Sequence, residues 1–239
     1  ADRGNQPQMA VRAQDGHEAA VRTALACCVF LLGACAGGPL PPDWQVQSHA
    51  SLEKFTQHYL EGNTRMAQRS FAQLQAAVAA TGRLELAARA ELARCALGVA
   101  ALDAEACATY QSMRGDATAE DRVYGDFVAG ELLTQDARRL PDRYRRVATA
   151  GDDAARNKAM QQIDDPVSRL VAAGVLFRRA QLSPEGLASA IDTASAAGYR
   201  RALLAYLQVQ AKRADAAGDS VAAQSIRRRI DLVVQSLPK

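Results

Sequence analysis

Apolar residues recur every three to four positions over most of the chain, which is the period of an amphipathic α-helix. The pattern is clearest at the end, where one stripe comprises Ala222, Ile226, Ile230, Val233, Val234 and Leu237. The segment before it carries a second stripe, made of Tyr199, Leu203, Tyr206, Leu207, Ala211 and Ala214. Gly218-Asp219 separates the two segments. We therefore expect a helical hairpin in which the two stripes face each other.

Turn signals divide the rest of the chain into segments of similar length. Glycine, alone or before a polar residue, interrupts the pattern at Gly62-Asn63, Gly82, Gly115-Asp116, Gly151-Asp152, Gly198 and Gly218-Asp219. Asp165-Pro166 and Ser183-Pro184 each place a capping side chain before a proline, which marks a helix start. Alanine is abundant and alternating β-branched residues are almost missing. The sequence therefore predicts an all-α chain of about ten helices.

Two segments differ from ordinary surface helices. Residues 167–177 are apolar nearly all round, apart from Ser168 and Arg169, so we expect them in the middle of the array. A narrower, alanine-rich stripe lies on an earlier segment and consists of Leu86, Ala90, Ala93, Leu97 and Ala100. Its small side chains would let another helix approach closely.

The first 34 residues have the composition of a targeting segment. Arg12 and Arg22 accompany an uncharged apolar stretch over residues 23–34, which is shorter than the roughly 20 residues that a membrane span requires. We expect translation to start at Met9. Residues 36–42 are rich in glycine and proline, which favour neither helix nor strand. Residues 35–47 are therefore predicted to form a flexible tether before a helical domain over 48–239.

The end of the targeting segment, Leu32-Gly33-Ala34-Cys35, resembles the lipobox of bacterial lipoproteins. The resemblance implies that a signal peptide over 1–34 is removed and that Cys35 carries a diacylglyceryl group, usually with an N-acyl chain. Several acyl chains would make the membrane attachment durable. Ala36, in place of an aspartate, implies the periplasmic face of the outer membrane by the enterobacterial sorting rule. The alternatives are an uncleaved anchor or cysteines that fill an apolar helix.

Hairpins recur at a spacing of about 35 to 40 residues with small and aromatic positions in their second helices. Ala67-x-x-x-Phe71 and Ala106-x-x-x-Tyr110 resemble the alanine and aromatic pair of tetratricopeptide (TPR) repeats. The resemblance implies a degenerate TPR-like α-solenoid over about 48–237. An irregular α-helical bundle is the alternative.

The charge of the chain is close to balanced. Removing residues 1–34 takes away three basic and three acidic residues, so the net charge stays at +3. A charge this small argues against nucleic-acid binding. The strongest local feature is an arginine cluster formed by Arg138, Arg139, Arg143, Arg145 and Arg146. It fits solvated helix faces with pairs such as Asp142 and Arg146, or contact with anionic lipid, an acidic partner or peptidoglycan carboxylates.

Motifs for catalysis are incomplete. Ser51-Leu52-Glu53-Lys54 fits the Ser-x-x-Lys pattern of penicillin-recognising enzymes without its partner motifs, so we interpret it as a helix start. His49 and His58 have no acidic or cysteine ligand in register, which argues against a metal site. Asp152-Asp153 and Asp164-Asp165 are expected to cap helices. No cofactor, metal or small-molecule substrate is predicted.

Two cysteines remain after the lipobox, Cys95 and Cys107, on either side of a turn expected at Leu102-Asp103. A disulfide between them would be permitted in the periplasm and would add roughly 3 kcal/mol to stability by loop entropy. Their offsets from the turn are unequal, eight residues and four, so the two side chains would miss each other by a helical turn if both helices were regular. Both the bonded and the free state stay open.

These features together predict an outer-membrane lipoprotein that is not an enzyme and whose helical surface binds an unidentified envelope protein, as a scaffold or assembly factor. The layout resembles that of lipoproteins that help to assemble pilus secretins, β-barrel proteins or peptidoglycan synthases. One alternative is an all-helical enzyme acting on peptidoglycan, which needs an acidic residue in an aromatic cleft near Tyr110, Tyr124 or Tyr144. The single tryptophan, Trp44, falls in the predicted tether. A helical-bundle lipoprotein of structural role is the other alternative.

Overall fold

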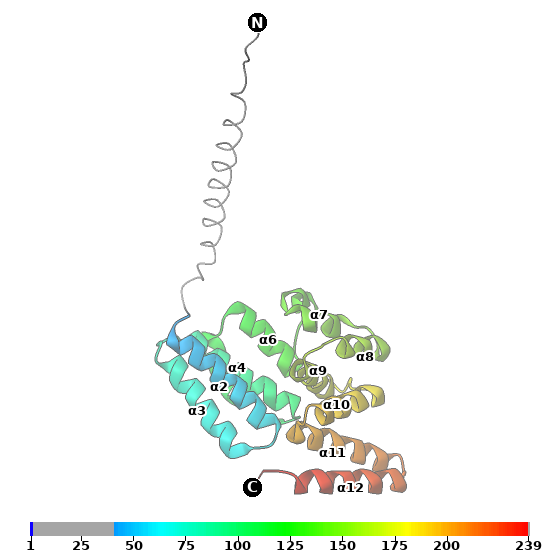
Figure 1. The fold of residues 1–239 in the computed structure, drawn as a ribbon. Coiled ribbons are helices and arrows are strands. Elements are labelled where there is room, and N and C mark those ends of the chain that lie inside the picture. The colour runs from blue at the N-terminus through cyan, green and yellow to red at the C-terminus, as the bar shows by residue number, and fades with distance from the viewer. Residues whose placement is uncertain (2–40, 239) are drawn as a thin grey trace. The chain divides into compact units, whose positions relative to one another are not determined.

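The computed structural model describes residue 1 and residues 41–238 (Figure 1). The chain divides into two compact units, Ala1–Pro41 and Pro42–Lys239, and the description below concerns the second. The predicted signal peptide and the lipobox with Cys35 lie outside the described residues. They therefore stay predictions.

The second unit is all-α over residues 42–238, as the periodicity predicts, with no strand in this range. Eleven α-helices follow one another: α2 (Asp43–Leu60), α3 (Thr64–Ala79), α4 (Leu84–Ala100), α5 (Ala108–Met113), α6 (Ala119–Ala129), α7 (Asp142–Thr149), α8 (Asp153–Gln161), α9 (Pro166–Arg178), α10 (Pro184–Ala196), α11 (Arg200–Ala216) and α12 (Ser220–Gln235). Two short 3₁₀ helices connect them, η1 (Arg114–Asp116) and η2 (Thr134–Arg139).

Local sequence signals place most of these boundaries. Every predicted glycine break lies between two α-helices. Asp165 accepts a hydrogen bond from the Ser168 amide at 2.8 Å, and Ser183 accepts one from the Gly186 amide at 3.0 Å. In both helices a proline occupies the first turn, where its missing N–H costs nothing. The two predicted Pro-initiated helix starts are confirmed.

The start of α2 differs from the prediction. The helix begins at Asp43, so residues 43–47, expected in the tether, are helical and include Trp44. Pro42 holds φ at −56° before the helix, and the Asp43 carboxylate in the first turn complements the helix dipole. Ser51 consequently lies in the middle of α2, and the helix start predicted there is wrong.

A pair of helices far apart in the sequence, α4 and α9, lies at the centre of the unit (Figure 1). The buried residues of α9 surround its axis and are Ser168, Leu170, Val171, Ala172, Ala173, Gly174, Val175 and Leu176. This confirms the prediction that residues 167–177 occupy the middle. The two backbones touch, because a Cβ built on Gly174 would overlap the carbonyl of Val99 in α4. Glycine is therefore required at this crossing.

Antiparallel hairpins form both ends of the unit, α2 with α3 and α11 with α12, and the hairpin predicted for the last two helices is confirmed. Contacts also join the two ends. Arg200 Nε donates to the Glu61 carbonyl at 3.1 Å, and Arg201 Nε donates to the Tyr59 carbonyl at 2.7 Å. Leu237 packs against the α2 to α3 turn at Gly62. In a linear stack of repeats each repeat touches only its neighbours, so the first and last hairpins of such a stack would not contact each other.

The residue pairs that resemble TPR positions are buried, but they lie in different settings. Ala67 and Phe71 both lie on α3 and belong to the core. Ala106 precedes α5 in a turn and packs against Gly98, whereas Tyr110 lies on α5 and is fully buried. Helix α5 has only six residues. The second pair therefore does not lie on one helix.

Candidate functional site

A groove runs between α2 and α3 on the first hairpin and has a volume of about 630 Å³. Its lining comprises Trp44, Gln47, Ala50, Ser51 and Lys54 from α2, and Gln73, Ala76, Ala77 and Ala80 from α3 and its C-cap. Ser51 and Ala77 are buried, whereas Ala76 and Ala80 are exposed. Small side chains leave room for the groove: Ala50 and Ser51 on α2, and Ala76, Ala77 and Ala80 on α3 and its C-cap. We call this feature the hairpin groove.

Two cations and one carboxylate lie at or beside the hairpin groove, since Asp43 is exposed one helical turn before Gln47. Lys54 is the charged residue of its lining. Helix α3 contains Arg65 and Arg69 and no acidic residue between Thr64 and Ala79. Arg69 is exposed one helical turn before Gln73, on the stripe that lines the groove. An acidic ligand would meet favourable charge here.

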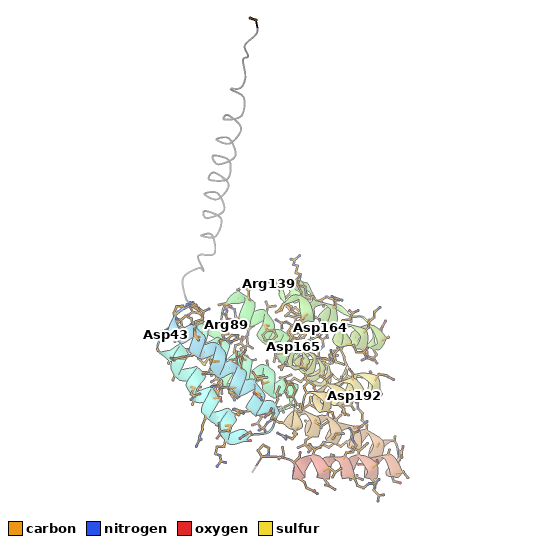
Figure 2. All side chains as sticks on the ribbon, viewed as in Figure 1. Asp43, Arg89, Arg139, Asp164, Asp165 and Asp192 are labelled. Carbon is orange, nitrogen blue, oxygen red and sulfur yellow. A yellow bond between two sulfur atoms is a disulfide. The ribbon has the colours of Figure 1, made fainter. Side chains whose placement is uncertain are left out.

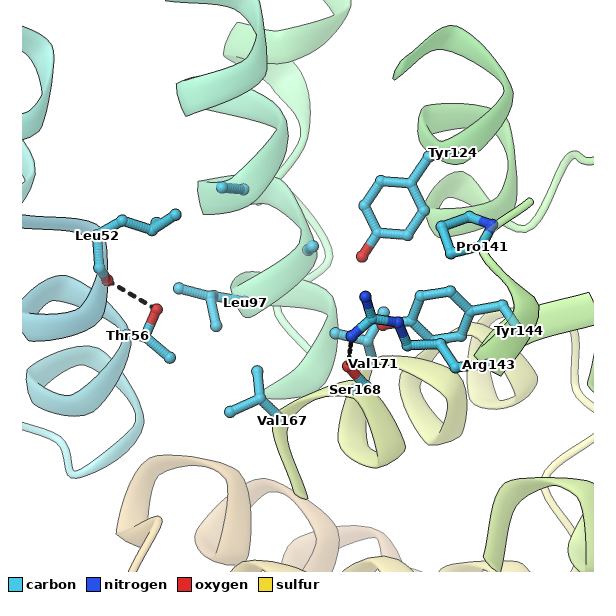
Figure 3. A pocket seen from close by; sticks show the side chains of 12 residues that line it. Leu52, Thr56, Leu97, Tyr124, Pro141, Arg143, Tyr144, Val167, Ser168 and Val171 are labelled. Atoms are coloured by element: carbon cyan, nitrogen blue, oxygen red, sulfur yellow. Dashed lines mark hydrogen bonds between the residues drawn. The ribbon is translucent and has the colours of Figure 1, made fainter. Parts of the chain in front are cut away.

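A second cavity, of about 290 Å³, lies between five elements (Figure 3). Its lining comprises Leu52, Thr56, Ala93, Ala96, Leu97, Tyr124, Pro141, Arg143, Tyr144, Val167, Ser168 and Val171. Leu52, Leu97 and Val167 lie on one side, and the tyrosine rings with the Arg143 guanidinium lie on the other. The described lining contains one cation and no carboxylate. We call this cavity the central pocket.

Arg143 contacts Ser168 and Tyr144 on the polar side of the central pocket. Arg143 Nη1 donates to Ser168 Oγ at 3.2 Å, and its guanidinium lies 5.9 Å from the Tyr144 ring centre. The Tyr124 and Tyr144 rings stack at 5.6 Å between centres. Burial, together with the neighbouring Tyr144, holds the pKa of Tyr124 well above its usual value. Burial also raises the pKa of Tyr144.

Sequence reasoning found part of this pocket. Arg143 belongs to the predicted arginine cluster, and Tyr124 and Tyr144 are the tyrosines at which the sequence predicts an aromatic cleft if an acidic residue joins them. Ser168 carried a signal of its own, because it interrupts an otherwise apolar helix and is buried. Nothing in the sequence joined these four residues, which come from α6, α7 and α9.

Three of the remaining arginines of the predicted cluster contact separate partners. Arg139, at the end of η2 (Figure 2), lies 3.6 Å from Asp136. Arg145 pairs with Asp142 at 2.9 Å, and Arg146 Nη1 donates to Gln162 Oε1 at 2.6 Å. The predicted pair of Asp142 with Arg146 is therefore wrong. The reason is tertiary, because the end of α8 supplies Gln162 to Arg146. Arg138 is exposed on η2.

Cys95 and Cys107 form a disulfide in the structure, with 2.04 Å between the sulfurs and 4.4 Å between the Cα atoms. Cys95 is buried on α4, and Cys107 is the N-cap residue of α5. The chain between them is a tight turn in which Leu102 has φ of 58° and the Asp103 amide donates to the Gly98 carbonyl. This irregular return of the chain removes the mismatch expected from two regular helices.

The other candidate side chains have local structural contacts. Asp152 accepts from the Ala155 amide at 2.7 Å, and Asp165, labelled with Asp164 in Figure 2, caps α9. His49 lies 3.6 Å from Glu53 on α2. Among residues 41–238, no three His, Cys, Asp or Glu side chains are grouped as metal ligands.

The helices of the described range are all too short or too polar to cross a membrane. The chain matches no protein-family model, no curated protein and no solved structure.

Proposed function

We propose that this chain is a bacterial lipoprotein, anchored through lipid on Cys35 to the periplasmic face of the outer membrane, that binds an envelope protein in the hairpin groove. In this proposal the protein acts as a scaffold or assembly factor, and its helical hairpins present the binding surface as TPR-like repeats do. The observation that carries the proposal is the alanine-lined groove on the first hairpin.

The lining of the hairpin groove suits an amphipathic helix of the partner. Alanine at Ala50, Ala76 and Ala80 permits close approach of a second backbone, which is how helices dock in apolar grooves. Trp44 at one end supplies a large, half-buried ring, and aromatic residues of this kind are common interface anchors. The partner helix would present small or apolar residues at a spacing of three and four.

Charge selects the partner further. Lys54 and Arg69 outnumber Asp43 beside the groove, so an acidic face on the partner helix would be attracted to it. Rim charges of this kind mainly raise the association rate, and salt screens them. We therefore expect partner binding to weaken as salt concentration rises.

The position of the groove in the chain suits an anchored protein. Seven residues, 36–42, separate Cys35 from the start of α2. A chain of seven residues reaches at most about 25 Å when fully extended. The hairpin groove would therefore stay close to the membrane surface, where envelope machinery assembles.

Anchoring is tested by fatty-acid labelling and membrane fractionation of the wild type and Cys35→Ala. We expect the label and the outer-membrane recovery to be lost in Cys35→Ala, since the thiol is the atom that accepts the lipid. Equal labelling of the two proteins, or recovery of the variant with the outer membrane, would contradict the anchor.

Partner binding is tested by placing a photoreactive residue at position 76 or at position 79 in intact cells. Ala76 lines the groove, whereas Ala79 is exposed on the same helix and does not line it. We expect one discrete protein adduct from position 76, and its loss when Ala80→Glu adds negative charge to the groove. The same adducts from both positions, or an adduct that survives Ala80→Glu, would contradict binding in the hairpin groove.

A further inference from the structure

We propose that the central pocket binds a small organic carboxylate with an apolar or aromatic body, and that Arg143 holds the carboxylate group. This site is separate from the hairpin groove and goes beyond the proposed partner binding. The charge, the hydrogen-bond donors and the volume of the pocket support this assignment.

Arg143 supplies the positive charge of the central pocket. Arg143 forms no ion pair within residues 41–238, whereas Arg139 and Arg145 on either side of it pair with aspartates. A guanidinium has five N–H donors, and the bond to Ser168 uses one of them. Arg143 is also exposed to solvent, so a ligand can reach it. The free edge of the guanidinium matches the two oxygens of a carboxylate.

The neighbouring hydroxyls supply a further donor. The Tyr124 and Tyr144 rings stack beside the Arg143 guanidinium, and both residues line the pocket. A phenol hydroxyl can donate its hydrogen to a ligand. Burial raises the pKa of both tyrosines, so both are neutral donors at physiological pH. The polar side of the pocket is thus arranged to receive a negative charge.

Two aspartates, Asp142 and Asp165, lie near the polar side of the central pocket, and both already have other partners. Asp142 pairs with Arg145, and Asp165 caps the first turn of α9 through the Ser168 amide. The first turns of α7 and α9 both contribute to the lining. Neither aspartate lines the pocket.

The wall opposite Arg143 and the tyrosines determines the polarity and size of the rest of the ligand. Leu52, Leu97 and Val167 line it with aliphatic carbon. A cavity of about 150 Å³ holds one benzene ring, so about 290 Å³ holds roughly twelve non-hydrogen atoms. A ring with a short acidic arm has this size, and its ring would pack beside the tyrosines. With a single cation, the site fits a monocarboxylate better than a phosphate.

The test measures calorimetric binding of 3-phenylpropionate, its neutral amide and inorganic phosphate to the full chain in detergent. We expect saturable binding of the acid, with the amide at least about tenfold weaker, because charge-assisted hydrogen bonds are lost. Arg143→Gln should weaken acid binding at least about tenfold and bring acid and amide together. Arg146→Gln is the matched control, since Arg146 lies on the same helix outside the pocket.

Several results would overturn the proposal. These are no saturable binding of the acid, equal binding of acid and amide, equal effects of Arg143→Gln and Arg146→Gln, or phosphate binding as tightly as the acid. Unchanged thermal unfolding of both variants shows that they remain folded. The partner adduct from position 76 should persist in Arg143→Gln, which separates failure of this site from failure of the hairpin groove.

Discussion

Helices α9 and α12 are both regular and similar in length, yet they are held in the molecule in different ways. Eight residues of α9 are buried, and they surround its axis. In α12 only Ala223 and Ile226 are buried, and Val221 and Leu232 are 78% and 67% exposed. The central helix is enclosed by neighbours, whereas the last helix rests on α11 along one stripe.

This difference predicts different modes of opening. Local unfolding is easiest where few apolar contacts must be broken, which describes α12. Helix α9 cannot separate from α4 without exposing the centre of the core. We therefore expect substitutions in α9 to change global stability and substitutions in α12 to change local stability.

The largest effect should come from Gly174→Ala. A Cβ at this position would overlap the Val99 carbonyl, and because both partners are backbone atoms, α4 and α9 would have to move apart. Overpacking of a well-packed core typically costs about 1 to 3 kcal/mol, and we expect a loss at or above the upper end. Urea unfolding monitored by circular dichroism measures it.

Gly151→Ala is the matched control for Gly174→Ala. No heavy atom lies within 4 Å of a Cβ built on Gly151. We expect its unfolding free energy to stay within about 0.5 kcal/mol of the wild type. Similar losses in the two variants would mean that the contact of α4 with α9 is not as close as described.

The next largest loss of stability should come from removing the disulfide that joins Cys95 of α4 to Cys107. The disulfide of Cys95 with Cys107 closes a loop with a sequence separation of 12 residues. Loop entropy gives it a contribution of about 2 to 3 kcal/mol, so Cys95→Ala/Cys107→Ala should lose this amount relative to the oxidised wild type. Urea unfolding with and without reductant measures the loss. A wild type insensitive to reductant would contradict the bond, and the double variant, which cannot be reduced, is the control.

The comparison also shows which features of the fold the sequence could predict. Helix starts at Asp165 and Ser183 are local, because the cap and the amide that it receives are three residues apart. The central position of α9 follows from apolar residues all round it. Helix α2 starts earlier than the sequence predicts, since the Gly/Pro tether and the helix meet at Pro42 without a side-chain cap that would mark the start.

Contacts between distant segments were not predictable in the same way. The partner of Arg146 is Gln162, and no spacing rule connects these two residues across α7 and α8. The central pocket gathers Tyr124, Arg143 and Ser168 from three helices, whose order along the chain says nothing of their meeting. Pairing of Cys95 with Cys107 depends on the irregular turn between them.

The smallest expected effect is the loss of a helix cap, and it distinguishes local from global opening most directly. Asp219 caps α12 by accepting from the Ala222 amide at 2.9 Å, and Asp165 caps α9 in the same way at 2.8 Å. Loss of a cap costs about 1 kcal/mol, so Asp219→Ala should speed hydrogen exchange in α12 by about fivefold and leave α9 unchanged. Asp165→Ala should instead lower protection throughout the core, because α9 opens only with the whole unit. If Asp219→Ala also lowered protection in α4 and α9, the last helix would belong to the same cooperative unit as the centre, and the contrast between the two helices would not extend to their stability.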